Sequence, residues 1–162
     1  MKFATVMPDT SHLIDAIRDL LLDCGLFDQL PPAEVLTAAG YFSLNRIAEG
    51  STIFREGDAG TFMCILASGA VSIRKTNVNG EELEVANLRR GRAFGEMAVL
   101  DGERRSASCV AISDSQLLTL GKDALDKMLQ EHPRTAAQMI RAIAVGMSKR
   151  LRMADGQLVN QL

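Results

Sequence analysis

The spacing of hydrophobic positions changes twice along the chain. Near the N-terminus, Leu13, Ile17, Leu20 and Cys24 recur with the spacing of an amphipathic helix. Between residues 41 and 120, glycines recur roughly every 8–12 residues among short apolar runs, as in a β-sandwich or barrel. Helical spacing then returns at Lys122. The pattern predicts helices over about 10–40, a β-roll over about 41–120 and C-terminal helices over about 122–155.

One hairpin has a strong local signal. Asn79-Gly80 lies between the strand-like segments 71–74 and 83–88. Asn-Gly is favoured in two-residue hairpin turns because both turn positions need a positive φ. No internal repeat, low-complexity segment or interdomain linker interrupts the sequence, so residues 1–162 are expected to form a single domain.

The composition is typical of a folded globular protein. Hydrophobic residues make up 47% and charged residues 23% of the 162 residues, which is close to the average for soluble domains. The 18 Lys and Arg against 20 Asp and Glu give a formal net charge of −2. Because nucleic-acid-binding domains carry a strongly basic surface, this balance argues against direct DNA binding.

Residues that other function classes need are missing. The scattered Cys24, Cys64 and Cys109 indicate buried thiols in a reducing compartment, not disulfides or zinc ligands. The two histidines are too few for a three-histidine metal site. Met1–Pro8 lacks the apolar stretch of a signal peptide, and no apolar run approaches the roughly eighteen residues of a membrane span. We therefore expect a cytoplasmic protein without a metal site or a membrane segment.

The most informative segment is 94–108, with the sequence FGEMAVLDGERRSAS. Gly95 permits a tight turn and a close approach of the backbone to a ligand. The short apolar run after it fits one helical turn, whose N-terminal amides can bind an anion. Arg105 returns at the entry to the next strand and can face the same anion. Together these residues predict a small anion-binding cradle.

This segment resembles the phosphate-binding cassette of cyclic-nucleotide-binding domains, which occur in bacterial catabolite activators, cyclic-nucleotide-dependent kinases and gated channels. The resemblance extends over roughly Phe27–Ala154 and includes the glycine-punctuated segments 49–58 and 63–71. It implies an α+β, mostly β fold. This fold is an eight-stranded antiparallel β-roll, similar to a jelly roll, flanked by N-terminal helices and a long C-terminal helix.

The resemblance also implies roles for individual residues. Glu96 would accept a hydrogen bond from the ribose 2′-hydroxyl, and Arg105 would pair with the cyclic phosphate. Backbone amides would add donors, and the Ser106 hydroxyl would contact the ligand or cap the loop. Arg104 is expected to face solvent, because counting from both ends of the motif selects Arg105. The predicted ligand-binding residues are Gly95, Glu96, Met97, Ala98, Arg105, Ser106 and Ala107, with Ile73 and Val85 lining the base pocket by position.

Other positions are open between two roles. The side chains of Met97, Val99 and Leu100 are expected in the core. In the family the C-terminal helix covers the base as a lid that responds to ligand. Its apolar stripe, continued to Leu158, is equally compatible with half of a parallel coiled-coil dimer or with a plain cover for the roll. The base contact on this helix stays open among Met147, Arg150, Leu151, Met153, Ala154 and Asp155.

The expected function is that of a cyclic-nucleotide receptor without catalytic activity. It would bind cyclic AMP in preference to cyclic GMP, use no metal or other cofactor, and signal through its C-terminal helix to an unknown effector protein or across a homodimer. The sequence ends at Leu162 without the helix-turn-helix domain of bacterial activators, so direct DNA binding is not expected. The alternative is a nucleotide-independent scaffold or interaction module on the same fold.

Overall fold

The computed structural model describes residues 4–5 and 10–162. Most of Met1–Pro8, on which the expectation of no signal peptide rests, lies outside these residues. The first elements are β1 (Ala4–Thr5), α1 (Thr10–Asp23) and α2 (Pro32–Ala39). The middle of the chain forms β2 (Ser43–Ile47), β3 (Thr52–Phe54), β4 (Phe62–Ser68), β5 (Ala70–Thr76), β6 (Glu82–Arg89), β7 (Ala93–Phe94), α3 (Glu96–Asp101), β8 (Ser108–Ala111) and β9 (Ser115–Gly121). The last elements are α4 (Lys122–Glu131) and α5 (Pro133–Asn160).

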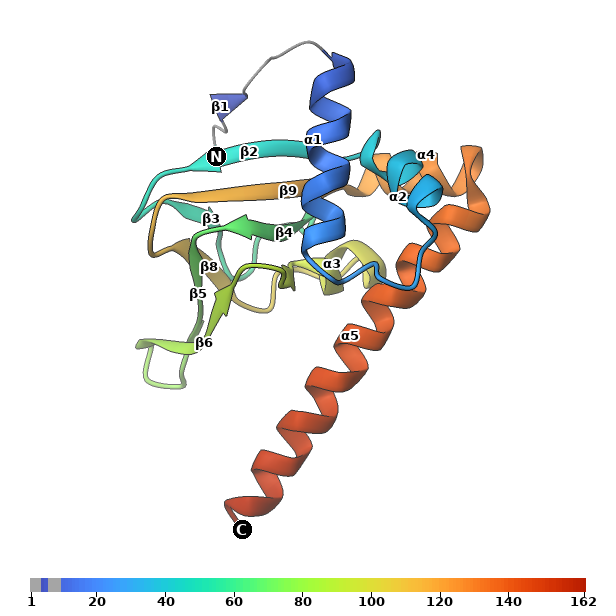
Figure 1. Ribbon diagram of the computed structural model, residues 1–162. Helices are drawn as coiled ribbons and strands as arrows, with labels where there is room; N and C mark the ends of the chain where they lie inside the picture. Colours follow the sequence, from blue (N-terminus) through green and yellow to red (C-terminus); the bar gives the residue numbers. More distant parts are fainter. Residues whose placement is uncertain (1–3, 6–9) are drawn as a thin grey trace.

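The strands form two antiparallel sheets, with the helices gathered at one side (Figure 1). One sheet has the order β1-β2-β9-β4-β7, and the other has the order β3-β8-β5-β6. The short β1 pairs with the edge of β2, and the remaining eight strands, β2 to β9, make the roll. The predicted fold class, an eight-stranded antiparallel β-roll between N-terminal helices and a long C-terminal helix, is therefore confirmed.

Strands β4 and β9 are buried on both faces because they separate two hydrophobic clusters. Successive side chains of a strand point to opposite faces of the sheet. Accordingly, Ile65 of β4 and Leu118 of β9 face one cluster, which packs against the helices and is called here the helix-side cluster. Leu66 of β4 and Leu117 of β9 face the other cluster, inside the roll, which is called the roll cluster.

Helix α5 has two halves with different surroundings. In its first half, Met139 and Ile143 belong to the helix-side cluster and are nearly inaccessible to solvent. From Leu151 onward every residue is exposed, and this half projects away from the roll (Figure 1). The helix continues through Gly156 to Asn160, about one turn beyond the predicted end at about 155. Within the described residues, no helix has both the length and the apolar content needed to cross a membrane.

The hairpin between β5 and β6 differs from the predicted two-residue turn. The loop spans residues 77–81, and only Gly80 has a positive φ, of 82°, because no described non-glycine residue does. The side-chain oxygen of Asn77 accepts hydrogen bonds from the backbone N–H groups of Asn79 and Glu81, at 2.9 Å each. This local capping by Asn77 replaces the left-handed conformation that the Asn-Gly turn would have required at Asn79.

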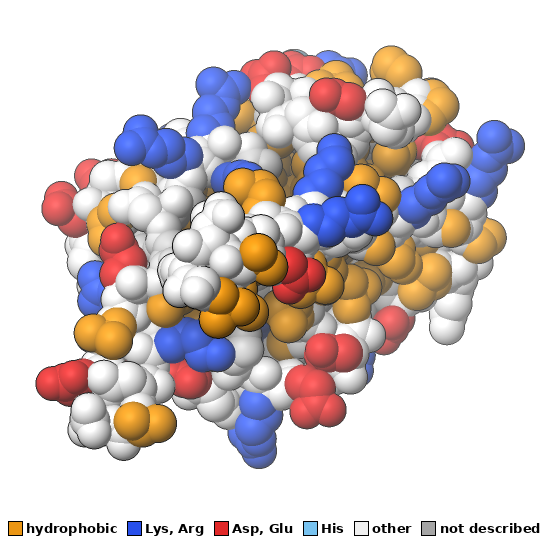
Figure 2. Space-filling view, turned by 90° about the horizontal axis from the view of Figure 1, so that it is seen from below, with side chains coloured by type: hydrophobic (Ala, Val, Ile, Leu, Met, Phe, Trp, Pro, Cys, Tyr) orange, Lys and Arg blue, Asp and Glu red, His pale blue; other side chains and the backbone are white. Residues whose placement is uncertain are grey.

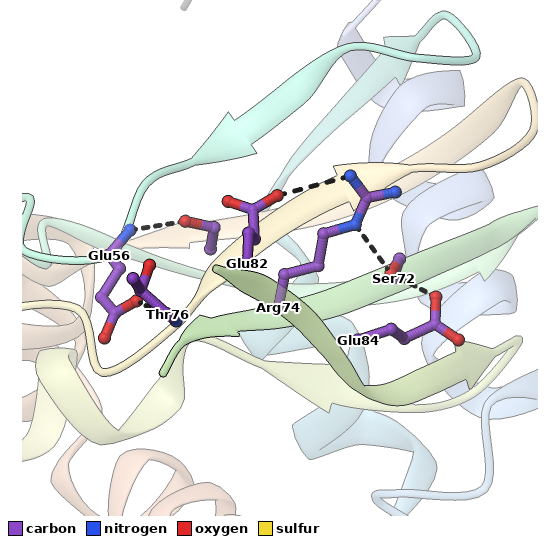
Figure 3. A network of polar contacts seen from close by, with 7 residues as sticks. Glu56, Ser72, Arg74, Thr76, Glu82 and Glu84 are labelled. Atoms are coloured by element: carbon purple, nitrogen blue, oxygen red, sulfur yellow. Dashed lines mark hydrogen bonds and ion pairs between the residues drawn. The ribbon is translucent and has the colours of Figure 1, made fainter. Parts of the chain in front are cut away.

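A polar network covers the outer face of β5 and β6 (Figure 3). Ser72 donates its hydroxyl proton to Glu84 and accepts a hydrogen bond from Arg74 Nε at 3.1 Å. Arg74 also forms an ion pair with Glu82 at 3.5 Å. Because side chains alternate along β5, Ile73 between Ser72 and Arg74 faces the roll interior, packed against the roll cluster. The network therefore holds the strand that positions Ile73.

Candidate functional site

A cavity of about 440 Å³ opens beside the roll cluster. Its walls come from β3, β5, β6, β7, α3, the 103–107 loop, β8 and α5. Segments far apart in the sequence therefore meet at one place. Eight of the nine predicted site residues line this cavity: Gly95, Glu96, Met97, Ala98, Arg105, Ser106, Ala107 and Ile73.

The ninth predicted residue, Val85, is not among the lining residues, whereas its neighbour Ala86 is. The pairing of β5 with β6 explains the difference. Ile73 pairs with Ala86 and Arg74 pairs with Glu84, so the register shifts at this point and Val85 has no partner of its own. Such a bulge changes the direction in which a side chain points. Val85 is 56% exposed.

The turn before α3 brings the backbone against a guanidinium group. Gly95 is the N-cap of α3 and has a left-handed conformation with φ of 76°. A Cβ atom at this position would lie 2.6 Å from Arg105 Nη1 and 3.1 Å from the Phe54 ring. Only glycine therefore allows both the turn and the observed place of Arg105.

Helix α3 connects the cavity to the helix-side cluster. Val99 is buried in that cluster, as expected for a core residue. Met97 and Leu100 were expected in the core as well, and this expectation was wrong, because they are 50% and 37% exposed. Since α3 has only six residues, one side of it packs inward while Met97 lines the cavity.

Arg105 is a buried cation that contacts backbone carbonyls and two aromatic rings. It is 4% exposed, and its guanidinium carbon lies 3.8 Å from the centre of the Phe54 ring. Nη1 donates to the carbonyl of Gly95 at 2.8 Å and Nη2 donates to the carbonyl of Phe62, whereas Nε has no hydrogen-bond partner. Burial lowers the pKa of Arg105. Among the described residues no carboxylate lies within ion-pair distance of it.

Arg104 differs from its neighbour in its exposure to solvent. It is exposed at the rim of the cavity, and its Nη1 donates to the carbonyl of Gly57 at 2.9 Å. The expectation that Arg105, rather than Arg104, faces inward agrees with this arrangement. The next residue, Ser106, is also exposed at the cavity wall.

Glu96 is buried and already has a partner. Its side chain is 3% exposed and pairs with the guanidinium of Arg150 from α5. Burial lowers the pKa of Arg150, and the nearby charge of Arg92 lowers it further. Of the six α5 residues left open as base contacts, only Arg150 lines the cavity. The structure thus brings Arg150, which is 54 residues away in the sequence, to the candidate ribose-binding carboxylate.

The apolar wall of the cavity contains residues that sequence reasoning did not select. These are Phe54, Leu88 and Cys109, which belong to the roll cluster. In the sequence they look like ordinary inward-facing strand residues, so no local signal separates them from the rest of the core. Burial raises the pKa of the Cys109 thiol well above its usual range, which keeps it protonated. Across the described residues, no three metal-ligating side chains of the His, Cys, Asp or Glu type come together.

The fold is a β-roll whose cavity is lined by the buried cation Arg105. Comparison with known proteins identifies the family to which the chain belongs. The family model described as "Cyclic nucleotide-binding domain" matches residues 44–132, more than half of the chain. The chain belongs to this family.

Two curated relatives are similar over most of the roll. The "Cyclic AMP receptor protein" of Thermus thermophilus is 38% identical over 133 residues, which are 82% of this chain and 60% of that protein. The "cAMP-dependent protein kinase regulatory subunit" of Aspergillus niger is 38% identical over 104 residues, covering 64% of this chain and 25% of the relative. The chain therefore spans at most about 60% of the length of these two relatives.

Solved structures agree with this assignment. The Thermus thermophilus catabolite activator protein superposes with a TM-score of 0.73 at 37% identity, over 82% of this chain and 61% of the other. A cyclic nucleotide-binding domain from Methylobacillus flagellatus KT has a TM-score of 0.81 and covers 94% of this chain and 85% of the other. Its identity of 24% supports the fold alone.

Proposed function

We propose that this chain binds a cyclic purine mononucleotide in the 440 Å³ cavity. Arg105 pairs with the cyclic phosphate, and Glu96 accepts a hydrogen bond from the ribose 2′-hydroxyl. Backbone N–H groups of residues 95–98 and of Ala107 add donors, Ser106 lies within reach of the ligand, and Ile73 contacts the base. For Val85 the position outside the cavity lining leaves Ala86 as the better candidate for the base contact.

One observation carries the proposal: Arg105 is buried, and no carboxylate of the described residues lies within ion-pair distance of it. Removing a charge from water costs several kcal/mol unless a counter-charge or hydrogen bonds offset it. Two carbonyl oxygens and two aromatic rings, Phe54 and Phe62, stabilise this guanidinium only in part. A bound phosphate would complete the pairing, and the guanidinium fork suits phosphate oxygens.

We propose cyclic AMP as the preferred nucleotide over cyclic GMP. The two curated relatives described above are named for cyclic AMP. We propose no turnover of the nucleotide. The Cys109 thiol in the cavity wall is held protonated by burial.

We further propose that the output passes through α5 to an effector protein or to a second copy of the chain. Leu151, Ala154 and Leu158 of the projecting half are exposed at helical spacing, which fits one side of a coiled coil. Figure 2 views the molecule from this end and shows hydrophobic side chains gathered on the surface. A cytoplasmic location stays a prediction from the sequence.

The alternative is a scaffold on the same fold that does not need nucleotide. One observation favours it: Arg150 already neutralises Glu96, so this acidic group is satisfied without ligand. Arg105 argues in the other direction. A thermal shift measurement separates the two functions, because a ligand that binds only the folded state raises the melting temperature, whereas the melting temperature of a scaffold would not change.

Calorimetric titration with cyclic AMP and cyclic GMP tests the proposal directly. We expect saturable binding at micromolar nucleotide, and a loss of about 2–5 kcal/mol in R105A, as when one partner of a buried charge pair is removed. R104A is the matched control and should lose less than about 1 kcal/mol, since the neighbouring arginine is exposed. If neither nucleotide binds the unmodified chain, the proposed function is wrong.

A further inference from the structure

A second crevice lies on the other side of the Glu96–Arg150 pair. Its volume is about 340 Å³, and its walls come from the 24–26 segment after α1, the 91–93 segment before α3, and α5. Arg92, Glu96 and Arg150 line both this crevice and the nucleotide cavity. The ion pair is therefore a shared wall between two hollows. A larger groove of about 620 Å³ along α5 shares Lys149 with the crevice.

The charges in this crevice do not balance. Three cations, Arg92, Lys149 and Arg150, line it together with one carboxylate, Glu96. The Glu96 carboxylate already forms an ion pair with Arg150. Among the described residues, the side chains of Arg92 and Lys149 have no hydrogen bond or ion pair. By contrast, Arg90 two residues earlier forms an ion pair with Asp23 at 3.4 Å.

The two guanidinium groups lie close enough to repel each other. Beyond the effect of burial, the charge of Arg92 disfavours the charged form of Arg150. Arg92 and Lys149 are exposed and Arg150 is half-buried, so water screens the repulsion in part, and an anion between these cations would reduce it further. Guanidinium groups with an adjacent ammonium group are well suited to phosphate oxygens, which accept several hydrogen bonds at once.

We propose that this crevice is a second anion site, which binds a phosphate group between Arg92, Lys149 and Arg150. A phosphate there competes with Glu96 for the Arg150 guanidinium and draws it away from the carboxylate. The binding itself does not depend on the proposed cyclic-nucleotide function, whereas the consequence for Glu96 rests on it.

Binding of an anion in the crevice changes the partner of Glu96 in the nucleotide cavity. When Arg150 pairs with the phosphate, Glu96 is free to accept a hydrogen bond from the ribose 2′-hydroxyl. Binding of an anion therefore strengthens binding of a cyclic ribonucleotide. Because linkage is reciprocal, the nucleotide strengthens binding of the anion by the same factor. Arg150 is thus the residue that couples the two sites.

The first experiment tests the site without nucleotide. Inorganic pyrophosphate is titrated calorimetrically into the unmodified chain at constant ionic strength, balanced with sodium chloride. We expect saturable binding, weakened at least about tenfold in the R92Q/K149Q double variant, since two charge-assisted contacts are lost. R152Q, which changes an exposed arginine of the same helix outside the crevice, should bind within about twofold of the unmodified chain.

Two outcomes of this experiment overturn the proposal. One is the absence of saturable pyrophosphate binding. The other is binding that is retained in R92Q/K149Q but lost in R105A, because the anion would then occupy the nucleotide cavity. Thermal unfolding of each variant shows whether it is folded. Should the double variant not fold, R150Q in the second experiment still tests the site.

The second experiment tests the coupling. We expect saturating pyrophosphate to tighten binding of cyclic AMP by about tenfold, a typical size for coupled sites, and to leave binding of 2′-deoxy cyclic AMP unchanged. R150Q should remove the effect on cyclic AMP. An equal effect on both nucleotides, or no effect on either, contradicts the role assigned to Glu96 and Arg150.

The source of the phosphate is distinguished by a third titration with a cyclic dinucleotide. If one molecule of the dinucleotide binds and excludes both cyclic AMP and pyrophosphate, the phosphate in the crevice belongs to a larger nucleotide that also fills the nucleotide cavity. If it does not bind while pyrophosphate does, the crevice takes a separate small anion. Pyrophosphate binding without any cyclic-nucleotide binding would leave the anion site standing and refute the proposed function, and the reverse result would refute only the anion site.

Discussion

The two hydrophobic clusters of this molecule differ in what they contain. The helix-side cluster joins α1, α2, α4, α5 and one face of the β4–β9 sheet. The roll cluster borders a cavity and surrounds the guanidinium of Arg105, with Phe54 at 3.8 Å from its guanidinium carbon. The first cluster packs the helices against the sheet and serves stability. The second leaves a charge and a hollow in the interior, which oppose stability and make ligand binding possible.

The largest effect on stability is expected in the helix-side cluster. Leu21 of α1 is fully buried there, so L21A should lower the free energy of unfolding by about 2–5 kcal/mol, through lost burial and a cavity. Denaturant unfolding measures this change. Nucleotide affinity of the folded variant should stay within about twofold, since distant sites act independently. A parallel loss of affinity would show that the two clusters do not have separate roles.

The next largest effect concerns the contact between the backbone and Arg105. G95A should cost about 2–3 kcal/mol of stability, because a side chain at positive φ is strained and the new Cβ collides with the guanidinium. G102A is the matched control. Gly102 has nearly the same φ, of 75°, with nothing within 4 Å of the added Cβ, so only about 1 kcal/mol is expected. If thermal unfolding shows equal losses of stability in G95A and G102A, the contact between residue 95 and Arg105 does not contribute to the effect.

A smaller effect, on nucleotide preference, is expected from a substitution at Glu96 of α3. E96Q keeps the shape of the side chain but removes the charge that pairs with Arg150 and accepts from the ribose. The preference for cyclic AMP over its 2′-deoxy analogue should narrow by about 1.5 kcal/mol, the value of a hydrogen bond to a charged group. Competition binding with the two nucleotides measures this difference. An unchanged preference would mean that Glu96 does not contact the ribose.

The smallest expected change in stability is an increase, whereas a substitution at a buried position usually lowers the free energy of unfolding. R105M replaces an unpaired buried charge by an apolar side chain of similar length, while leaving two carbonyl oxygens without their donor. The relief of desolvation should exceed the lost hydrogen bonds, so the nucleotide-free chain gains about 1 kcal/mol of stability. Thermal unfolding without nucleotide checks the gain, and calorimetry should show that binding is lost. A less stable variant that still binds would contradict the contrast between the clusters.

Much of the fold and part of the site could be predicted from local patterns. The glycine punctuation and the two helical ends led to the β-roll between helices, and the segment from Gly95 to Ala107 lines one cavity as expected. These features depend on residues close in sequence, where turn geometry and side-chain alternation determine which groups meet. The Asn79-Gly80 turn is an exception, because hydrogen bonds to Asn77 override the preference of the dipeptide.

Other features depend on packing between distant segments. The partner of Glu96 is Arg150, on a helix that passes the cavity only after it packs on the helix-side cluster. Val85 gives way to Ala86 in the cavity wall because of a one-residue shift in strand pairing. Neither relationship can be read from the spacing of residues. For the partner of Glu96, six α5 side chains were possible from the sequence. For Val85, the alternation of a strand does not reveal where a bulge occurs.

The sequence by itself determined the class of fold and the position of the cassette with its glycine, glutamate and arginine. Short-range geometry and the burial of apolar side chains are enough for these. Only the tertiary structure decided that Arg105 is buried with no described carboxylate within ion-pair distance, that Arg150 pairs with Glu96, and that a second cationic crevice shares this pair. Burial and electrostatic pairing are properties of the assembled structure, because they depend on which distant groups exclude water from one another.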